Sequence, residues 1–223
     1  MSDKLLTRVF RALAGSPQTQ PSAPVLTAAH AVLNVGGNSK SIPLPEIYQG
    51  WDQIWLDIDP AVKPDVLCDA RELLNTPPAV YDAVLCSHNL EHYYPHDARR
   101  VLAGFKHVLK PGGFAHILVP DVNQVLRRML EQQLDIEDVL YQSEAGPITV
   151  HDVLYGFGKQ IEKTGNDFFA HKAGFTPKSL YALLQSVGFK HIYIGCGDLE
   201  IIAYAFMDIP SPDFKELLSL PAA

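Results

Sequence analysis

The chain has 223 residues, which suits one large domain with a sizeable core. Its net charge of −7 gives no electrostatic sign of nucleic-acid binding, and no stretch approaches the ~20 apolar residues of a membrane-spanning helix. Cys68, Cys86 and Cys196 lie far apart in apolar segments, which indicates buried thiols in a reducing compartment rather than disulfides or a zinc knuckle. Because Arg8 and Arg11 interrupt the N-terminal apolar residues and no cleavage site follows, we expect no signal peptide and a cytoplasmic protein.

The N-terminal segment has a pattern of its own. Residues 4–14 carry apolar side chains at helical spacing, with basic residues on the other side. We expect a short helix that caps the domain or contacts a second copy of the chain in a homodimer; a basic membrane-surface helix is the alternative. Residues 15–24 have the composition of a linker. The sequence thus predicts a helix and linker over 1–24 and one domain over 25–223.

Strand and helix patterns alternate over the first half of this domain. Five apolar runs without strict alternation are typical of strands covered on both faces: 29–35, 53–59, 65–69, 81–88 and 112–120. Between the fourth and fifth runs, residues 98–109 carry apolar side chains at helical spacing, with Asp97 near the start and Lys110 to Gly113 at the end. This rhythm predicts an α/β fold with a doubly wound, parallel sheet.

The second half departs from this rhythm. Residues 122–170 are more polar, and we expect a helical insertion over the carboxyl edge of the sheet. Residues 176–188 show a cap, a proline at the first helical position and a closing glycine, which predicts the last helix. Two strands, 191–195 and 200–207, are joined too closely for a parallel crossover. We therefore expect a mostly parallel sheet of about seven strands with a C-terminal antiparallel hairpin.

The first strand ends in a glycine turn, VLNVGGNSKSIPLP, residues 32–45. A triphosphate loop is excluded, because Asn34 and Ser39 occupy its two glycine positions. The dinucleotide fingerprint needs a third glycine and a helix that faces the pyrophosphate, but here only Gly36 and Gly37 are present and prolines follow. Such a turn still lets the backbone approach a ligand that has no phosphate.

Acidic residues end the next two strands. Asp57 and Asp59, about twenty residues after the glycine turn, share one face of their strand and are placed to accept ribose hydroxyls, while Ile58 opposes them. Asp59 precedes a proline and is equally suited to forming a turn. The third strand ends at Asp69 and Ala70, where an acid is able to accept from an exocyclic amine. A glycine turn, a ribose acid and an adenine acid without a phosphate site indicate S-adenosylmethionine.

Six segments extend this pattern: LNVGG (33–37), WLDIDP (55–60), DVLCDARELL (65–74), YDAVLCSHNLEHY (81–93), VLKPGGFAHILVPD (108–121) and HKAGFTPKSLYALLQSVGF (171–189). With these segments the chain resembles the class I S-adenosylmethionine-dependent methyltransferases, in particular the small type in which the fourth strand runs into SHxLEH. The resemblance implies a Rossmann-like fold, S-adenosylmethionine as the cofactor and methyl transfer as the activity.

The resemblance also implies a set of cofactor-binding residues: Asn34, Gly36, Gly37, Asn38, Asp57, Ile58, Asp69, Ala70, Ser87, His88 and Asn89. Within it, the glycine turn would hold the amino-acid part, Asp57 the ribose, and the residues after the fourth strand would border the sulfonium. Ile58, Asp69 and Ala70 would contact the adenine. The family usually has a third glycine where this chain reads Asn38-Ser39-Lys40, so a non-catalytic scaffold protein with a degenerate turn is the alternative function.

The segment HNLEH, residues 88–92, reads as the inverted zinc-protease motif. Metal binding would require one continuous helix. His88 directly follows a strand, and Pro95 separates His92 from His96. We therefore expect no metal and a loop at the carboxyl end of the fourth strand, where doubly wound folds place their sites.

The sequence indicates the residues that would bind the methyl acceptor less clearly than those that would bind the cofactor. Methyl transfer needs a base only if the acceptor is a hydroxyl or a protonated amine, and His88, His92 and His171 are the candidates. Tyr155 and His171, in or next to the insertion, are candidate substrate residues; alternatively His171 packs under the last helix and satisfies a backbone carbonyl. The aromatic and polar composition of 122–170 favours a small-molecule, sugar-like acceptor rather than nucleic acid.

Overall fold

The computed structural model describes residues 24, 26–37, 39–143 and 146–221. The expected N-terminal helix, with its homodimer contact, lies outside the described residues, as do Asn38 and nearly all of the expected linker. Within the described ranges, no helix combines the length and apolar character that crossing a bilayer requires.

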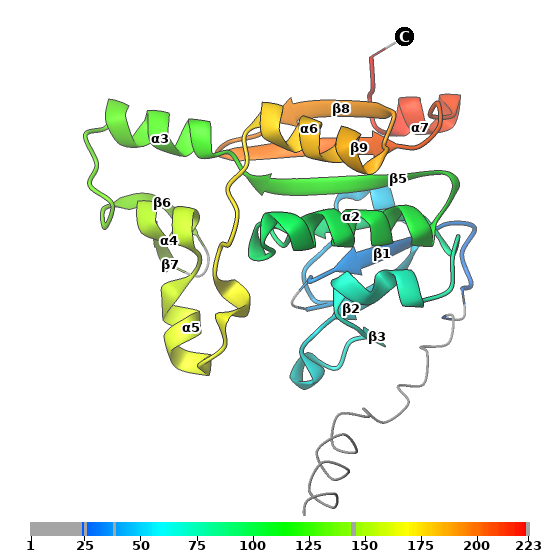
Figure 1. Ribbon diagram of the computed structural model, residues 1–223, viewed down its shortest axis with the longest axis horizontal. Helices are drawn as coiled ribbons and strands as arrows, with labels where there is room; N and C mark the ends of the chain where they lie inside the picture. Colours follow the sequence, from blue (N-terminus) through cyan, green and yellow to red (C-terminus); the bar gives the residue numbers. More distant parts are fainter. Residues whose placement is uncertain (1–23, 25, 38, 144–145, 222–223) are drawn as a thin grey trace, which may run out of the picture.

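A seven-stranded sheet forms the centre of the fold (Figure 1). Its order is β3 (Val66–Leu67), β2 (Asp52–Asp57), β1 (Ala31–Val35), β4 (Tyr81–Ser87), β5 (Leu109–Pro120), β9 (Glu200–Phe206) and β8 (His191–Cys196). The first five strands are parallel, and β9 is antiparallel to both β5 and β8. The predicted doubly wound, mostly parallel sheet with a C-terminal antiparallel hairpin is confirmed.

The strands are apolar because both faces of the sheet are covered. Along β1, Leu33 and Val35 pack in the core beneath α2 (Pro95–Val108) and α6 (Pro177–Val187), which lie in front of the sheet in Figure 1. Val32 points the other way, into a smaller core with side chains from η1 (Glu46–Tyr48) and the segment around α7 (Pro212–Leu217). Every residue of β1 is buried, which explains why its sequence does not alternate.

Short 3-10 helices follow three of the strands at their carboxyl ends. These are η2 (Pro60–Val62) after β2, η3 (Ala70–Asn75) after β3 and η4 (Leu90–His92) after β4. The expected third strand is thereby reduced to two residues, because Asp69 already caps η3. The HNLEH segment is not one continuous helix, since His88 precedes η4 with a φ of 47°.

The segment 122–170 forms a separate lobe beyond the carboxyl ends of the parallel strands (Figure 1). It consists of α3 (Val122–Glu131), β6 (Val139–Ser143), β7 (Gly146–Thr149), α4 (Val150–Tyr155), α5 (Gly158–Thr164) and η5 (Asp167–Phe169). Most of these elements are helices, and the antiparallel β6–β7 hairpin is an addition that the sequence did not predict. Leu140 is the only buried residue of β6, so the hairpin has too little apolar alternation to be recognised in the sequence.

The three cysteines are free thiols, but they are not equally buried. Cys86 is buried within β4, and Cys68 is half-buried after β3. The expectation of a buried thiol is wrong for Cys196, which is exposed at the end of β8, an edge strand of the sheet.

The cap of α6 gives a test of the fold. The Thr176 hydroxyl accepts from the Ser179 backbone N–H at 3.2 Å, and the Ser179 hydroxyl accepts from the Thr176 N–H at 2.9 Å. We expect Thr176→Ala to lower the free energy of unfolding by about 1 kcal/mol in chemical denaturation, because it leaves a helix donor unsatisfied. Thr176→Ser keeps the hydroxyl and is the control; equal losses in both variants would contradict the capping role.

Candidate functional site

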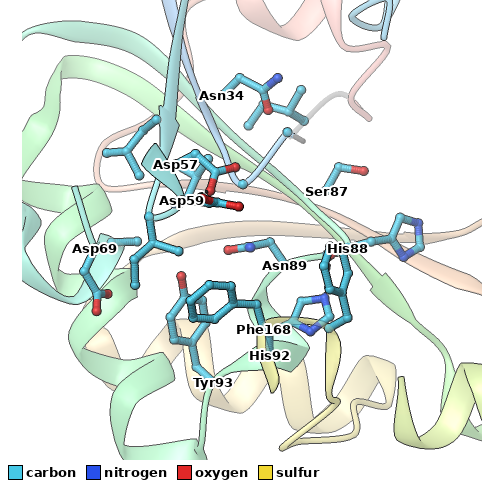
Figure 2. A pocket seen from close by; sticks show the side chains of 18 of the residues that line it. Asn34, Asp57, Asp59, Asp69, Ser87, His88, Asn89, His92, Tyr93 and Phe168 are labelled. Atoms are coloured by element: carbon cyan, nitrogen blue, oxygen red, sulfur yellow. Dashed lines mark hydrogen bonds between the residues drawn. The ribbon is translucent and has the colours of Figure 1, made fainter. Parts of the chain in front are cut away.

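The sheet has a switch point between β1 and β4. From β1 the chain proceeds outward through β2 and β3, whereas β4 and β5 lie on the other side. Doubly wound sheets bind ligands in the crevice at such a point, outside the carboxyl ends of the strands. A cavity of about 620 Å³, here called the main pocket, opens there between the segments that follow β1, β2, β3 and β4 and the segment around η5 (Figure 2).

All of the described candidate cofactor residues line the main pocket: Asn34, Gly36, Gly37, Asp57, Ile58, Asp69, Ala70, Ser87, His88 and Asn89. They come from the ends of four strands, as the sequence pattern predicted. The eleventh candidate, Asn38, belongs to the undescribed residues.

The glycine turn allows two asparagine side chains to pack against it. Gly36 has a φ of 69°, and its N–H donates to the Leu56 carbonyl at 2.9 Å. A Cβ atom at Gly36 would lie 2.2 Å from Nδ2 of Asn89, and one at Gly37 would lie 2.4 Å from Nδ2 of Asn34. Only glycine therefore permits this contact between the loop after β1 and the loop after β4.

Asn89 supplies an unsatisfied polar atom to the pocket. Its Oδ1 is buried and has no hydrogen-bond partner among the described residues. Figure 2 shows the Asn89 amide near the middle of the pocket, between the two acids that follow β2 and the ring of Tyr93. A buried amide oxygen is costly without a donor, so this position fits a ligand that carries an N–H or O–H group.

The two acids after β2 have different roles. Oδ1 of Asp57 accepts from the Asp59 N–H at 2.9 Å, while Oδ2 accepts no hydrogen bond from any described residue. Asp59 uses Oδ1 to accept from the Ala61 N–H at 2.8 Å and caps η2. Both side chains line the main pocket, and each has one carboxylate oxygen that accepts no hydrogen bond from a described residue. Asp57 ends β2 itself, whereas Asp59 also serves as the cap of η2.

Asp69 is already paired. Its carboxylate accepts from the Arg71 backbone N–H at 2.9 Å and from the guanidinium at 2.6 Å and 2.9 Å. Partial burial opposes ionisation, but the hydrogen bonds and charge of Arg71 outweigh it and lower the pKa of Asp69. The expected adenine-amine contact would therefore compete with a side-chain ion pair that the sequence analysis did not anticipate.

Sequence reasoning missed the aromatic wall of the main pocket. Tyr93 and Tyr94 follow the SHNLEH segment, and Phe168 and Phe169 come from η5 in the insertion. Tyr93 and Tyr94 directly follow a motif that the sequence analysis singled out, so their place near the site was predictable from the sequence. Nothing in the sequence places η5, about eighty positions further on, against the same cavity. These rings give the pocket the apolar surface typical of small-molecule sites.

A second cavity of about 490 Å³, here called the side pocket, adjoins the main pocket and shares His88, His92 and Phe169 with it. The His88 ring lies between two carboxylates, with Nδ1 3.7 Å from Oε1 of Glu91 and Nε2 3.3 Å from Oε2 of Glu200. Partial burial disfavours the charged ring, but Glu200 and Glu91 outweigh this effect and raise the pKa of His88 to about 9. His88 is thus a cation at neutral pH.

His171 also reaches the side pocket. Its Nδ1 lies 2.9 Å from the Val153 carbonyl, so Nδ1 carries the proton and Nε2 presents a lone pair. Burial lowers the pKa of His171, and His92 and His88 add to this effect against the opposing charge of Glu91, so the ring is neutral at pH 7. The anticipated carbonyl contact is present, and the carbonyl belongs to α4.

The backbone position of His171 depends on a close approach that Gly156 permits. The His171 N–H donates to the Tyr155 carbonyl at 3.0 Å. Gly156 has a φ of 100°, and a Cβ atom there would lie 2.0 Å from the Phe169 carbonyl oxygen. Gly156 therefore lets the end of α4 approach the segment that carries His171.

Tyr155 and His92, the two remaining candidate residues, are less well placed to contact a substrate. The Tyr155 side chain is 56% exposed, packs against His151 and lines neither pocket. His92 lines both pockets, but its Nδ1 lies 3.2 Å from the Ala170 carbonyl and its Nε2 lies 3.1 Å from the His88 carbonyl. Both ring nitrogens of His92 thus lie close to a backbone carbonyl, and the tautomer decides which of the two donates.

The ion pairs of His88 predict how the pKa of its ring responds to the loss of one carboxylate. We expect Glu200→Gln to lower the pKa of His88 from about 9 toward its ordinary value of 6.5, because one of two carboxylates is lost. Because the folded pKa is the raised one, the stabilisation from these ion pairs is full below pH 6.5 and is lost as the pH rises through about 9. NMR titration of the histidine ring signals measures this change. Glu216→Gln on α7 is the control, and an unchanged His88 titration in Glu200→Gln would contradict the assignment.

Comparison with known proteins is consistent with this architecture. Residues 53–117, from β2 into β5, match the model of a family described as a methyltransferase domain. A search of curated protein sequences gives no match.

Solved structures share the fold at low identity. A protein of Pyrococcus horikoshii OT3 is 14% identical, with 92% of each chain covered and a TM-score of 0.53. A SAM-dependent methyltransferase of Methanosarcina mazei is 16% identical, with 82% of this chain and 94% of that chain covered and a TM-score of 0.50. An O-methyltransferase family protein of Burkholderia thailandensis is 12% identical at a TM-score of 0.52; the match covers 79% of this chain but 50% of that one.

These likenesses show the fold, and the family match adds the type of domain. The sheet order, the site at the switch point and the match over 53–117 agree with one another. They support S-adenosylmethionine, which the sequence resemblance implied, as the cofactor. The protein therefore shares its fold with solved methyltransferases and carries, over residues 53–117, a segment that matches the methyltransferase domain.

Proposed function

We propose that the protein is an S-adenosylmethionine-dependent methyltransferase that methylates a small-molecule acceptor. In this proposal the main pocket binds the cofactor and the side pocket binds the acceptor. The observation that carries it is that ten residues expected from the sequence to bind the cofactor line one cavity at the switch point of the sheet. The two cavities meet at His88, His92 and Phe169, so a cofactor and an acceptor would be neighbours.

The main pocket offers hydrogen-bonding and apolar groups that suit the parts of the cofactor. Oδ2 of Asp57 would accept from ribose hydroxyls, and Ile58 would border the adenine. The unsatisfied Oδ1 of Asn89 accepts from an N–H or O–H group, and the glycine turn presents backbone atoms. When bound, the cofactor supplies a methyl group on a positively charged sulfonium, so the protein need only orient the partners and exclude water.

His171 is the candidate base of the side pocket. Its neutral ring presents the Nε2 lone pair, which is able to accept a proton from an acceptor hydroxyl or amine. Oε1 of Glu91, 3.9 Å from Nε2, would stabilise the resulting imidazolium. His88 is less suited to this role because it is already a cation, and His92 because both of its nitrogens lie close to backbone carbonyls.

A non-catalytic scaffold protein is the second candidate function. The absence of a third glycine at Asn38-Ser39-Lys40 favours it. In the described part of this turn, the polar side chains bond to other residues of the chain. The Ser39 and Ser41 hydroxyls lie 2.8 Å apart, and the Lys40 ammonium pairs with the Asp65 carboxylate at 2.6 Å. The free oxygen of Asp57 and the unsatisfied oxygen of Asn89 favour the enzyme, because a scaffold has no need of either.

Asp57 provides the test of cofactor binding. We expect Asp57→Asn to weaken binding of S-adenosylhomocysteine by at least about tenfold in calorimetric titration, because a charge-assisted hydrogen bond contributes ~1.5–3 kcal/mol. Asp59→Asn is the matched control, since it removes the neighbouring charge from a residue that caps η2. Equal effects of the two changes would contradict the ribose assignment, and no binding by the wild type would favour the scaffold protein.

His171 provides the test of the base. We expect His171→Asn to lower turnover by at least about 100-fold and to leave cofactor affinity nearly unchanged, because the asparagine amide still donates to the Val153 carbonyl but cannot accept the proton. The measurements are methyl transfer to an acceptor found by screening, its pH profile, and calorimetry with S-adenosylhomocysteine. Unchanged turnover would assign His171 to packing.

A further inference from the structure

Glu91 is a buried acid without a matching donor. It is only 1% exposed, and neither carboxylate oxygen has a hydrogen-bond partner among the described residues. It lines the side pocket rather than the interior of the sheet. Burying a carboxylate in this way is costly unless a cation or a hydrogen-bond donor meets it. The position therefore calls for a positively charged or donating ligand.

The neighbouring side chains do not supply that donor in full. Nδ1 of His88 is 3.7 Å from Oε1 of Glu91, but the same ring also faces Glu200 at 3.3 Å. One imidazolium thus serves two carboxylates, which leaves an excess negative charge in this group. His171 presents its Nε2 lone pair toward Glu91 at 3.9 Å, so two acceptors face each other across a gap.

The walls of the side pocket fit an organic cation. None of its described lining residues is a lysine or arginine. Two further acids line it but are already partnered, since Asp152 accepts from the Thr149 N–H and hydroxyl and Asp198 pairs with Arg128, which leaves the charge of Glu91 for a ligand. The lining also includes the rings of Tyr141, Phe157 and Phe169. Carboxylates combined with aromatic faces are the chemistry that recognises amines.

We propose that the side pocket binds its acceptor through a protonated amine, with Glu91 as the counter-ion and the aromatic side chains as the wall. This inference rests on the proposed function and specifies its substrate class. An amino sugar would satisfy both this requirement and the sugar-like acceptor expected from the composition of the insertion.

A metal ion is the competing occupant. Ligand atoms of Glu91, His92 and His171 all lie within 4.8 Å of one another. Both nitrogens of His92, however, face backbone carbonyls at 3.2 Å and 3.1 Å. Glu91 and His171 alone are fewer than the three protein ligands of a catalytic zinc site. The geometry therefore favours the amine.

The test compares a cation with its neutral counterpart. The full chain, saturated with S-adenosylhomocysteine at pH 7, is titrated in a calorimeter with 2-phenylethylamine and, separately, with 2-phenylethanol. We expect the amine to bind at least about tenfold more tightly, because the buried carboxylate attracts only the charged ligand. Glu91→Gln should reduce amine binding to the level of the alcohol, whereas the control Asp213→Asn on α7 should leave the preference intact.

Several outcomes would overturn the inference: equal binding of amine and alcohol, no binding of either up to about 10 mM, or a preference that persists in Glu91→Gln. Thermal denaturation checks that Glu91→Gln is folded; if it is not, the wild-type preference decides alone. Stoichiometric binding of zinc or manganese ions that is lost in Glu91→Gln and that blocks the amine would assign the site to a metal instead.

The same experiment separates this inference from the proposed function. Binding of S-adenosylhomocysteine without an amine preference would contradict only the substrate class. No binding of S-adenosylhomocysteine by the wild type would contradict the proposed function itself.

Discussion

The parallel pairing of β1 and β4 is the constraint on which the rest of the site depends. Their register places Asn34 beside Leu85, so the loops that follow the two strands leave the sheet at the same edge. Because Gly36 has no Cβ, the Asn89 amide lies directly against the turn after β1. Two loops that are about fifty positions apart in the sequence thereby form one wall of the main pocket. The neighbouring pairs β1–β2 and β4–β5 then place Asp57 on one side of it and the insertion on the other.

The fold and part of the candidate site were predictable from local signals. Apolar runs, helix caps and glycine turns act over a few residues, so the sequence located seven strands, α2 and α6. The glycine turn and the acids at Asp57 and Asp69 indicated a ligand site, and the family resemblance implied the rest of the ten residues that line the main pocket. Contacts between distant segments were not predictable in the same way. Pairing of Asp69 with Arg71 depends on rotamers, β6 has one buried residue, and Phe168 reaches the main pocket only because the insertion folds back over the sheet edge. The sequence indicates Glu91 only as part of the HNLEH motif, because its residue type gives no sign that its side chain is buried.

The two pockets divide the chemistry between the sheet and the insertion. Strand ends supply the main pocket with the free oxygens of Asp57 and Asn89. The insertion supplies most of the aromatic lining of the side pocket and, through the carbonyl of Val153, holds His171, which directly follows it. His88 joins the two: its left-handed backbone, uncommon outside glycine, turns the chain away from β4, and its ring links Glu91 to Glu200 on β9. The charged groups therefore surround the boundary where cofactor and acceptor would meet.

The central claim is that the main pocket is a cofactor site that opens onto an acceptor pocket. A crystal structure of the full chain grown with S-adenosylhomocysteine tests it most directly. The account predicts that the ribose hydroxyls contact Asp57, that the amino-acid part lies along the turn at Gly36, and that the sulfur faces the boundary at His88. A ligand bound elsewhere on the chain, or bound with its ribose turned away from Asp57, would contradict the account.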